Sequence, residues 1–245
     1  STLYETSIID FVHADVWTRP GLKLRERLLI SLAGTAATKD AAACQGYATG
    51  ALKGGHLTLL ELREAALQLA VYDGWASGGV LDRAVTVAAK ELGLAEPKME
   101  RLPDDPADKA ERIARGQDGF RRVAQTDAPP PFTPYLDTGV LNFVMSDLWG
   151  RPGLDERSRR FVTLVGAAFS NAPTPMRSHS YSAMNSGDLT KDELLEFCLH
   201  FALHGGWPRG AWHISMPRWA ACCLRSATPW ICRRPPTRTR LGVRS

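Results

Sequence analysis

The chain carries an internal repeat, and this repeat constrains the fold more than any other feature of the sequence. Shifting the sequence by 132 residues places residues 3–79 on residues 135–211 without a gap, and 26 of the 77 paired positions are identical. The segment Asp15–Leu22 (DVWTRPGL) falls on Asp147–Leu154 (DLWGRPGL). Composition alone does not produce one-third identity over an ungapped stretch of this length. The sequence therefore predicts a tandem duplication of one structural unit.

Each copy shows the periodicity and the start signals of helices. Leu24, Leu28 and Leu32 recur every four residues, which is typical of one apolar helix face. Capping boxes, in which a threonine oxygen and a glutamate satisfy free N–H groups, are expected to open helices at Thr58–Glu61 and Thr190–Glu193. Strand signals are scarce. We therefore predict an all-α fold made from a tandem duplication of one helical-hairpin unit.

The segment between the two copies differs from both in composition. It contains several prolines, including the run Pro129–Pro131, and these exclude a continuous helix. A polar stretch at 107–125 predicts one short helix. We expect a first unit at 1–94, a proline-rich linker at 95–134, a second unit at 135–224 and a basic, irregular tail at 225–245.

The formal net charge of +4 is unevenly distributed. The last acidic residue is Glu196, and eight arginines follow it, so residues 1–196 carry a net charge of −4. The basic character therefore belongs to the end of the chain and does not indicate an anionic partner for the repeated units. Nucleic-acid binding is not expected, because no recognised reading motif accompanies the arginines.

Composition also narrows the class of protein. The chain is 44% hydrophobic and 23% charged, as globular proteins are, which excludes wholesale disorder. No apolar run is long enough to span a membrane, and the first residues do not form a signal peptide pattern. The five cysteines are odd in number and form no C-x-x-C pair, so neither a disulfide framework nor a structural zinc site is expected. We expect a cytoplasmic protein with reduced thiols and no membrane partner.

Titratable side chains gather in the second unit. Glu196, His200 and His204 are spaced four apart and so share one helix face, and His179 lies on the preceding predicted helix. The corresponding residues of the first unit are Glu64, Gln68, Tyr72 and Tyr47. All three imidazoles are therefore missing from the first unit. Such asymmetry is expected when one copy carries out chemistry and the other supports it, and it predicts one working site per chain.

Three interpretations of this cluster stay open. Two histidines four apart on a helix can bind zinc together with a carboxylate, although no H-E-x-x-H motif is present. A histidine oriented by a glutamate can also serve in acid–base catalysis, because its proton exchanges near neutral pH. The third interpretation is a polar network that only packs helices together. The concentration of the histidines in one copy favours acid–base catalysis, and no metal is expected.

Other positions that correspond between the two copies each have a structural and a functional interpretation. Arg151 and its counterpart Arg19 precede Pro-Gly, where an arginine either locks the turn by bonding carbonyls or binds a ligand carboxylate. Trp207 is more typical of packing, but we keep it among the candidate substrate contacts. Cys44 has Met176 as its counterpart, which favours a packing thiol.

The combined pattern resembles the carboxymuconolactone decarboxylase family. It consists of Trp-x-Arg-Pro-Gly-Leu, Arg-x-Arg before an apolar helix, Gly-x-Leu-Thr-x-x-Glu, and a Glu followed ten residues later by Gly-Trp. The resemblance extends over residues 3–92 and 135–224. In the second unit it rests most clearly on Trp149–Leu154, His179, Glu196, His200 and Gly206–Pro208.

The resemblance implies an all-α fold of helical hairpins that assembles with threefold symmetry. Single-unit members form six-copy assemblies, so a tandem chain is expected to be a homotrimer. The family includes alkyl hydroperoxidase D-like proteins, which depend on a C-x-x-C pair and a histidine. The matching segments here, 41–47 and 173–179, lack two thiols, so peroxidase chemistry is not expected.

The decarboxylase branch implies a cofactor-independent reaction on a small carboxylated lactone or β-keto-type acid. By this resemblance His179 and His200 supply proton donation and oxyanion contact, and Glu196 orients a histidine. The candidate substrate-binding residues are Arg151, Arg157, His204, Trp207, Glu26 and Tyr72. His204 stands where the family usually has tyrosine. Two other functions stay open: an isomerase, cyclase or hydrolase using the same residues, and a helical oligomer that binds a ligand without catalysis.

Overall fold

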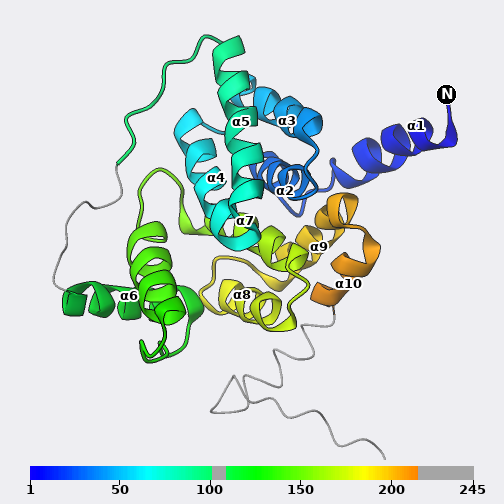
Figure 1. The fold of residues 1–245 in the computed structure, drawn as a ribbon. Helices are drawn as coiled ribbons and strands as arrows, with labels where there is room; N and C mark the ends of the chain where they lie inside the picture. Colours follow the sequence, from blue (N-terminus) through cyan, green and yellow to red (C-terminus); the bar gives the residue numbers. More distant parts are fainter. Residues whose placement is uncertain (101–108, 215–245) are drawn as a thin grey trace, which may run out of the picture.

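The computed structural model describes residues 1–100 and 109–214, and all regular structure in these ranges is helical (Figure 1). The all-α prediction is therefore confirmed for this part of the chain. No helix within it is long and apolar enough to cross a membrane. The basic tail expected at 225–245 lies outside the described residues. The elements are α1 (Leu3–Ser7), η1 (Ile8–Val16), α2 (Leu24–Ala37), α3 (Ala41–Lys53), α4 (Leu59–Asp73), α5 (Trp75–Glu91), α6 (Lys109–Ala124), η2 (Tyr135–Leu148), α7 (Glu156–Phe169), α8 (Pro173–Asn185), α9 (Lys191–Gly205) and α10 (Trp207–Ile214).

Three helices of the first unit recur in the second at the offset found in the sequence. The bounds of α2, α3 and α4, shifted by 132 residues, coincide with those of α7, α8 and α9. Both predicted capping boxes form, at Thr58 and at Thr190. The wide-turn helices η1 and η2 also end alike, because the N–H groups of Trp17 and Trp149 each bond the carbonyl five residues back. These matches support two structurally similar units. That the units arose by tandem duplication stays a prediction.

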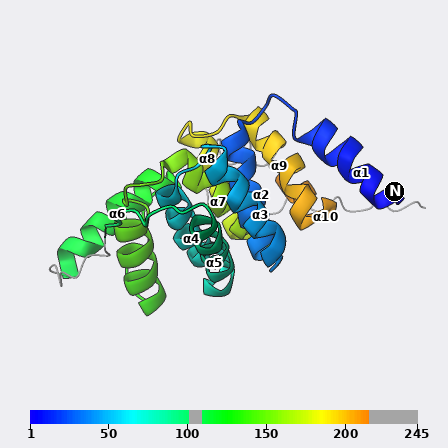
Figure 2. The ribbon, with the colours of Figure 1, turned by 90° about the horizontal axis from the view of Figure 1, so that it is seen from above.

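The linker contributes the helix expected at 107–125, and this helix, α6, packs against η2. Glycine allows the close approach, because a Cβ at Gly116 would lie 2.1 Å from the carbonyl oxygen of Leu141. Apolar side chains of both helices form a small second core. The linker therefore covers η2, the first helix of the second unit. In Figure 2, α6 and α1 lie at opposite ends of the molecule.

The third helix of each unit packs most extensively against the next helix of its own unit, α5 or α10, and in addition exchanges partners with the other unit. α4 packs more extensively against α7 than against α2 of its own unit, and α9 packs more extensively against α2 than against α7. Two glycines permit this contact: a Cβ at Gly34 would lie 2.7 Å from Cβ of His204, and one at Gly166 would lie 2.8 Å from Cβ of Tyr72. One hydrophobic core contains residues of both units. Any site on α4 or α9 is therefore built from both copies.

Candidate active site

Salt bridges between arginine and glutamate attach α4 and α9 to the opposite unit. Arg151 donates from Nε and Nη2 to Glu64 of α4, with a shortest distance of 2.8 Å. In the mirrored contact, Arg19 Nε lies 2.9 Å from Glu196 of α9. Arg159 in turn donates to the Arg151 carbonyl oxygen at 3.0 Å. Arg151, expected to bind either the carbonyls of its turn or a substrate, is 7% exposed and engaged with the carboxylate of Glu64, a partner that neither alternative named.

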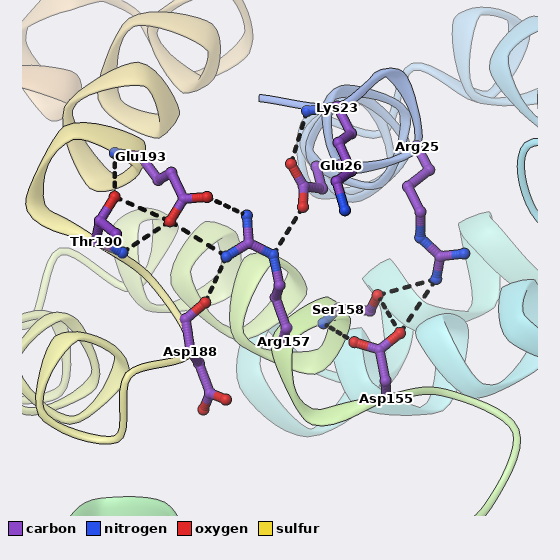
Figure 3. A network of polar contacts seen from close by, with 9 residues as sticks. All are labelled: Lys23, Arg25, Glu26, Asp155, Arg157, Ser158, Asp188, Thr190 and Glu193. Atoms are coloured by element: carbon purple, nitrogen blue, oxygen red, sulfur yellow. Dashed lines mark hydrogen bonds and ion pairs between the residues drawn. The ribbon is translucent and has the colours of Figure 1, made fainter. Parts of the chain in front are cut away.

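A second set of charges joins α2 to α7 and α7 to α9 (Figure 3). Arg157 lies between two carboxylates, with Nε 2.7 Å from Glu26 and Nη2 2.7 Å from Glu193. Arg25 reaches in the opposite direction, 3.2 Å from Asp155. The bond from Arg157 lowers the pKa of Glu193 to about 2. Arg157 and Glu26, both expected to bind substrate, are therefore engaged with each other.

His179, His200 and His204 do not form the single cluster that the sequence suggested. His179 of α8 faces Tyr72 of α4, with ring centroids 5.0 Å apart. His200 and His204 of α9 face the first unit instead, where both Nε2 atoms lie 2.9 Å from the Ser31 hydroxyl oxygen. The separation arises because α9 packs against α2 of the first unit, whereas α4 packs against α7 of the second.

The histidine pair of α9 forms a directed chain of hydrogen bonds. Arg27 Nη1 lies 3.3 Å from His200 Nδ1, and arginine can only donate, so His200 carries its proton on Nε2. That proton is donated to Ser31, whose hydroxyl then donates to His204. Burial is the largest cause that lowers the pKa of His200 to about 3 and that of His204 to about 4. Both imidazoles are therefore neutral at neutral pH.

We expected Glu196 to orient a histidine, but its carboxylate contacts two arginines instead. Its carboxylate binds Arg19 and also lies 3.5 Å from Arg27 Nη2. The hydrogen bond from Arg19 is the first cause that lowers the pKa of Glu196. Glu196 reaches His200 only through Arg27, so it serves the attachment of α9.

A pocket of about 880 Å³ lies at the His179–Tyr72 pair. It is bounded by α4, α6, η2, α7 and α8 together with the linker, and neither His200 nor His204 lines it. Burial, followed by the charge of Arg160, lowers the pKa of His179 to about 4. Burial raises the pKa of Tyr72 to about 12. Polar lining residues include Tyr72, Asp127, Tyr135, Ser178, His179 and Ser182.

One further contact fixes the protonation of this pair. Trp149 Nε1 donates to the Tyr72 oxygen at 2.9 Å, so the phenol retains its own hydroxyl hydrogen for an acceptor. At neutral pH the pocket therefore presents a neutral imidazole and a protonated phenol. Such a pair can donate hydrogen bonds to an oxyanion and exchange a proton with carbon.

Sequence reasoning missed Arg160, whose partner Ser182 lines the pocket. Its side chain is fully buried, with Nε 3.0 Å from Asp188 and Nη1 3.1 Å from the Ser182 hydroxyl oxygen. The guanidinium carbon is 5.1 Å from the centre of the Trp149 ring. A signal was available, because Leu28 occupies this position in the first unit. An arginine replacing a core leucine in one copy indicates a local need for charge.

The remaining candidates lie outside the pocket. Trp207, expected as a possible substrate contact, is 57% exposed and stands 6.1 Å from the Phe11 ring. Cys44 is buried, and burial raises the pKa of its thiol to about 11, as fits a packing residue. Among the residues that the structure describes, no three His, Cys, Asp or Glu side chains gather into a possible metal site.

Fold and site together define an all-α protein in which two similar units exchange helices and enclose a His–Tyr pair. Residues 4–82 match the carboxymuconolactone decarboxylase family. The 4-carboxymuconolactone decarboxylase of Acinetobacter baylyi (strain ATCC 33305 / BD413 / ADP1) is 35% identical over 69 residues, which cover 28% of this chain and 51% of that enzyme. The chain thus spans about half the length of this curated relative. The predicted resemblance is confirmed for residues 4–82, the part of the chain that this family matches.

Proposed function

We propose that the chain is a cofactor-independent decarboxylase that acts on a small carboxylated lactone or β-keto-type acid in the pocket at His179. One observation carries the proposal: His179 and Tyr72 face each other in a pocket of about 880 Å³ beside a buried arginine. The relationship to a 4-carboxymuconolactone decarboxylase supports the reaction class.

The proposed reaction needs no electron acceptor. The bond between the ring carbon and the carboxylate breaks, CO₂ leaves, and the electron pair moves toward the lactone carbonyl to give a dienolate. Tyr72 donates its hydroxyl hydrogen to the developing oxyanion, and a preorganised donor of this kind supplies much of the stabilisation. A proton added to carbon completes the product.

His179 is the proposed proton donor. A carboxylate bound beside it raises its pKa, which offsets the lowering caused by burial and by Arg160. The imidazolium then delivers its proton to the dienolate and regains one from water. His200, which the resemblance suggested as a second catalytic residue, is assigned to the attachment of α9, because it is fully buried between Arg27 and Ser31.

The assembly expected from the resemblance is also proposed, as a homotrimer. Exposed apolar side chains on the projecting first helices support an association surface, since Leu3 is 87% and Ile9 62% exposed. The mass of the full chain in native mass spectrometry tests this. Three copies are expected, and a monomer over the working concentration range would contradict it.

The test of function is incubation of the purified full chain with 4-carboxymuconolactone, with CO₂ and the organic product measured together. We expect stoichiometric CO₂ and an enol-lactone in the NMR spectrum. Conversion without CO₂ would favour an isomerase, cyclase or hydrolase using the same pair. Binding without conversion would favour a non-catalytic ligand-binding protein.

A further inference from the structure

Arg160 is a buried cation whose hydrogen-bonding capacity is only partly used. Its side chain is fully buried in α7, and Nε and Nη1 bond Asp188 and Ser182. Nη2 is also buried, but it has no hydrogen-bond partner among the described residues. A buried guanidinium N–H without an acceptor is costly, which indicates that an acceptor binds there in the working protein.

Arg160 itself does not line the pocket, but one of its partners does. Ser182, which accepts the bond from Arg160 Nη1, lines the pocket one helical turn after His179. The charge of Arg160 acts on both pocket residues, since it lowers the pKa of His179 and opposes the rise in the pKa of Tyr72. A second guanidinium, that of Arg122, lies close enough for Arg160 to lower its pKa further, after burial. Each guanidinium is also paired with a carboxylate, Arg160 with Asp188 and Arg122 with Glu156.

We propose that Arg160 is the specificity-determining residue of the pocket, where its Nη2 binds an oxygen of a ligand carboxylate. The inference rests on the proposed function and identifies the group that recognises the acid, a role that the sequence had given to Arg151 or Arg157. Those two arginines are already paired with Glu64 and Glu26, whereas Arg160 has an unused donor. The pocket thus selects an anion over a neutral molecule of the same shape.

Binding of a matched pair of probes tests this without turnover. The acid is 5-oxotetrahydrofuran-2-carboxylate, and the neutral probe is its primary amide, which keeps the ring and the shape. Calorimetry on the wild-type chain is expected to give roughly tenfold or tighter binding of the acid, as a charge-assisted hydrogen bond supplies. Arg160→Leu, which installs the residue found in the first unit, is expected to remove the preference.

Two controls keep the result interpretable. Arg63→Leu removes another mostly buried arginine, one that binds Asp82 and Glu96 and does not line the pocket, and is expected to keep the preference. If Arg160→Leu does not fold because Asp188 loses its partner, the double variant with Asp188→Asn replaces it. Equal binding of acid and amide by the wild type, or an acid preference that survives in either Arg160 variant, would overturn the inference.

The outcome is separate from that of the proposed function. Acid preference that depends on Arg160, without CO₂ release, would keep the inference and reject the decarboxylase. CO₂ release without acid preference would keep the decarboxylase and reject the role of Arg160.

Discussion

Tyr72 and His179 come from different units and meet edge to face, with ring centroids 5.0 Å apart. The corresponding pair, Tyr47 and His204, meets in the same way at 6.1 Å. The tyrosine lies on the third helix of a unit in the first pair and on the second helix in the other, so the two residue types have exchanged places. Of the two pairs, the first lines the pocket beside Arg160, and the proposed chemistry is assigned there.

Replacement of Tyr72 by phenylalanine is expected to reduce both activity and stability. Loss of the hydroxyl removes the proposed oxyanion donor, so kcat should fall by about 10²-fold. It also leaves the Trp149 N–H without its acceptor, which should lower the free energy of unfolding by about 1–3 kcal/mol. Steady-state CO₂ release and urea denaturation measure the two effects. Tyr47→Phe is the control, and an equal loss of kcat in it would contradict the assignment.

Local structure was largely predictable from the sequence. Capping boxes and leucine spacing depend on neighbouring residues, so the helices at 24–37 and 59–73 and their starts follow from the chain itself. The linker helix at 109–124 was likewise expected. The 132-residue offset of the repeat also predicted which helix of the first unit corresponds to which helix of the second.

The exchange of helices was not predictable, and it changed the site. The spacing of apolar residues along a helix is the same whether that helix packs against its own unit or against the other one. His179 and His200 were therefore assigned to one cluster, although the exchange carries His200 to Ser31. The signal for Arg160 is likewise a difference between the copies, since Leu28 stands at its position in the first unit, but one such difference does not reveal which residues the arginine contacts.

The buried histidines predict that acid destabilises the protein. His179, His200 and His204 have folded pKa values of about 4, 3 and 4, below the ordinary 6.5, so the unfolded chain binds more protons. Stability is then complete above pH 6.5 and falls as the pH drops toward 4. Each histidine contributes a slope of up to about 1.4 kcal/mol per pH unit. The charged neighbours, Arg27 beside His200 and Arg160 beside His179, disfavour the imidazolium further.

A single replacement isolates one of these contributions. His200→Gln installs the residue that the first unit has at this position, where Gln68 bonds both Arg159 and Thr163. The free energy of unfolding, measured in urea between pH 7 and 4.5, should fall less steeply in the variant than in the wild type. Parallel curves for the two proteins would show that His200 is not neutral when buried.

The two arginine–glutamate pairs are expected to differ in their importance. Arg151→Met leaves Glu64, which is 1% exposed, with one fewer partner, and should lower the free energy of unfolding by about 3 kcal/mol. Arg19→Met should cost distinctly less, because the Arg19 side chain is 47% exposed and Glu196 retains Arg27. Chemical denaturation of both variants gives the ranking. The reverse order would contradict the attachment of α4 through Arg151.

The most direct test compares His179 with His200 in one assay. CO₂ release from 4-carboxymuconolactone is measured for His179→Ala, His200→Gln and a surface control, His56→Ala, each checked for folding by circular dichroism. A pocket centred on His179 predicts a loss of about 10²-fold or more in His179→Ala and rates near wild type in the other two variants. Full activity in His179→Ala, or a comparable loss confined to His200→Gln, would contradict it.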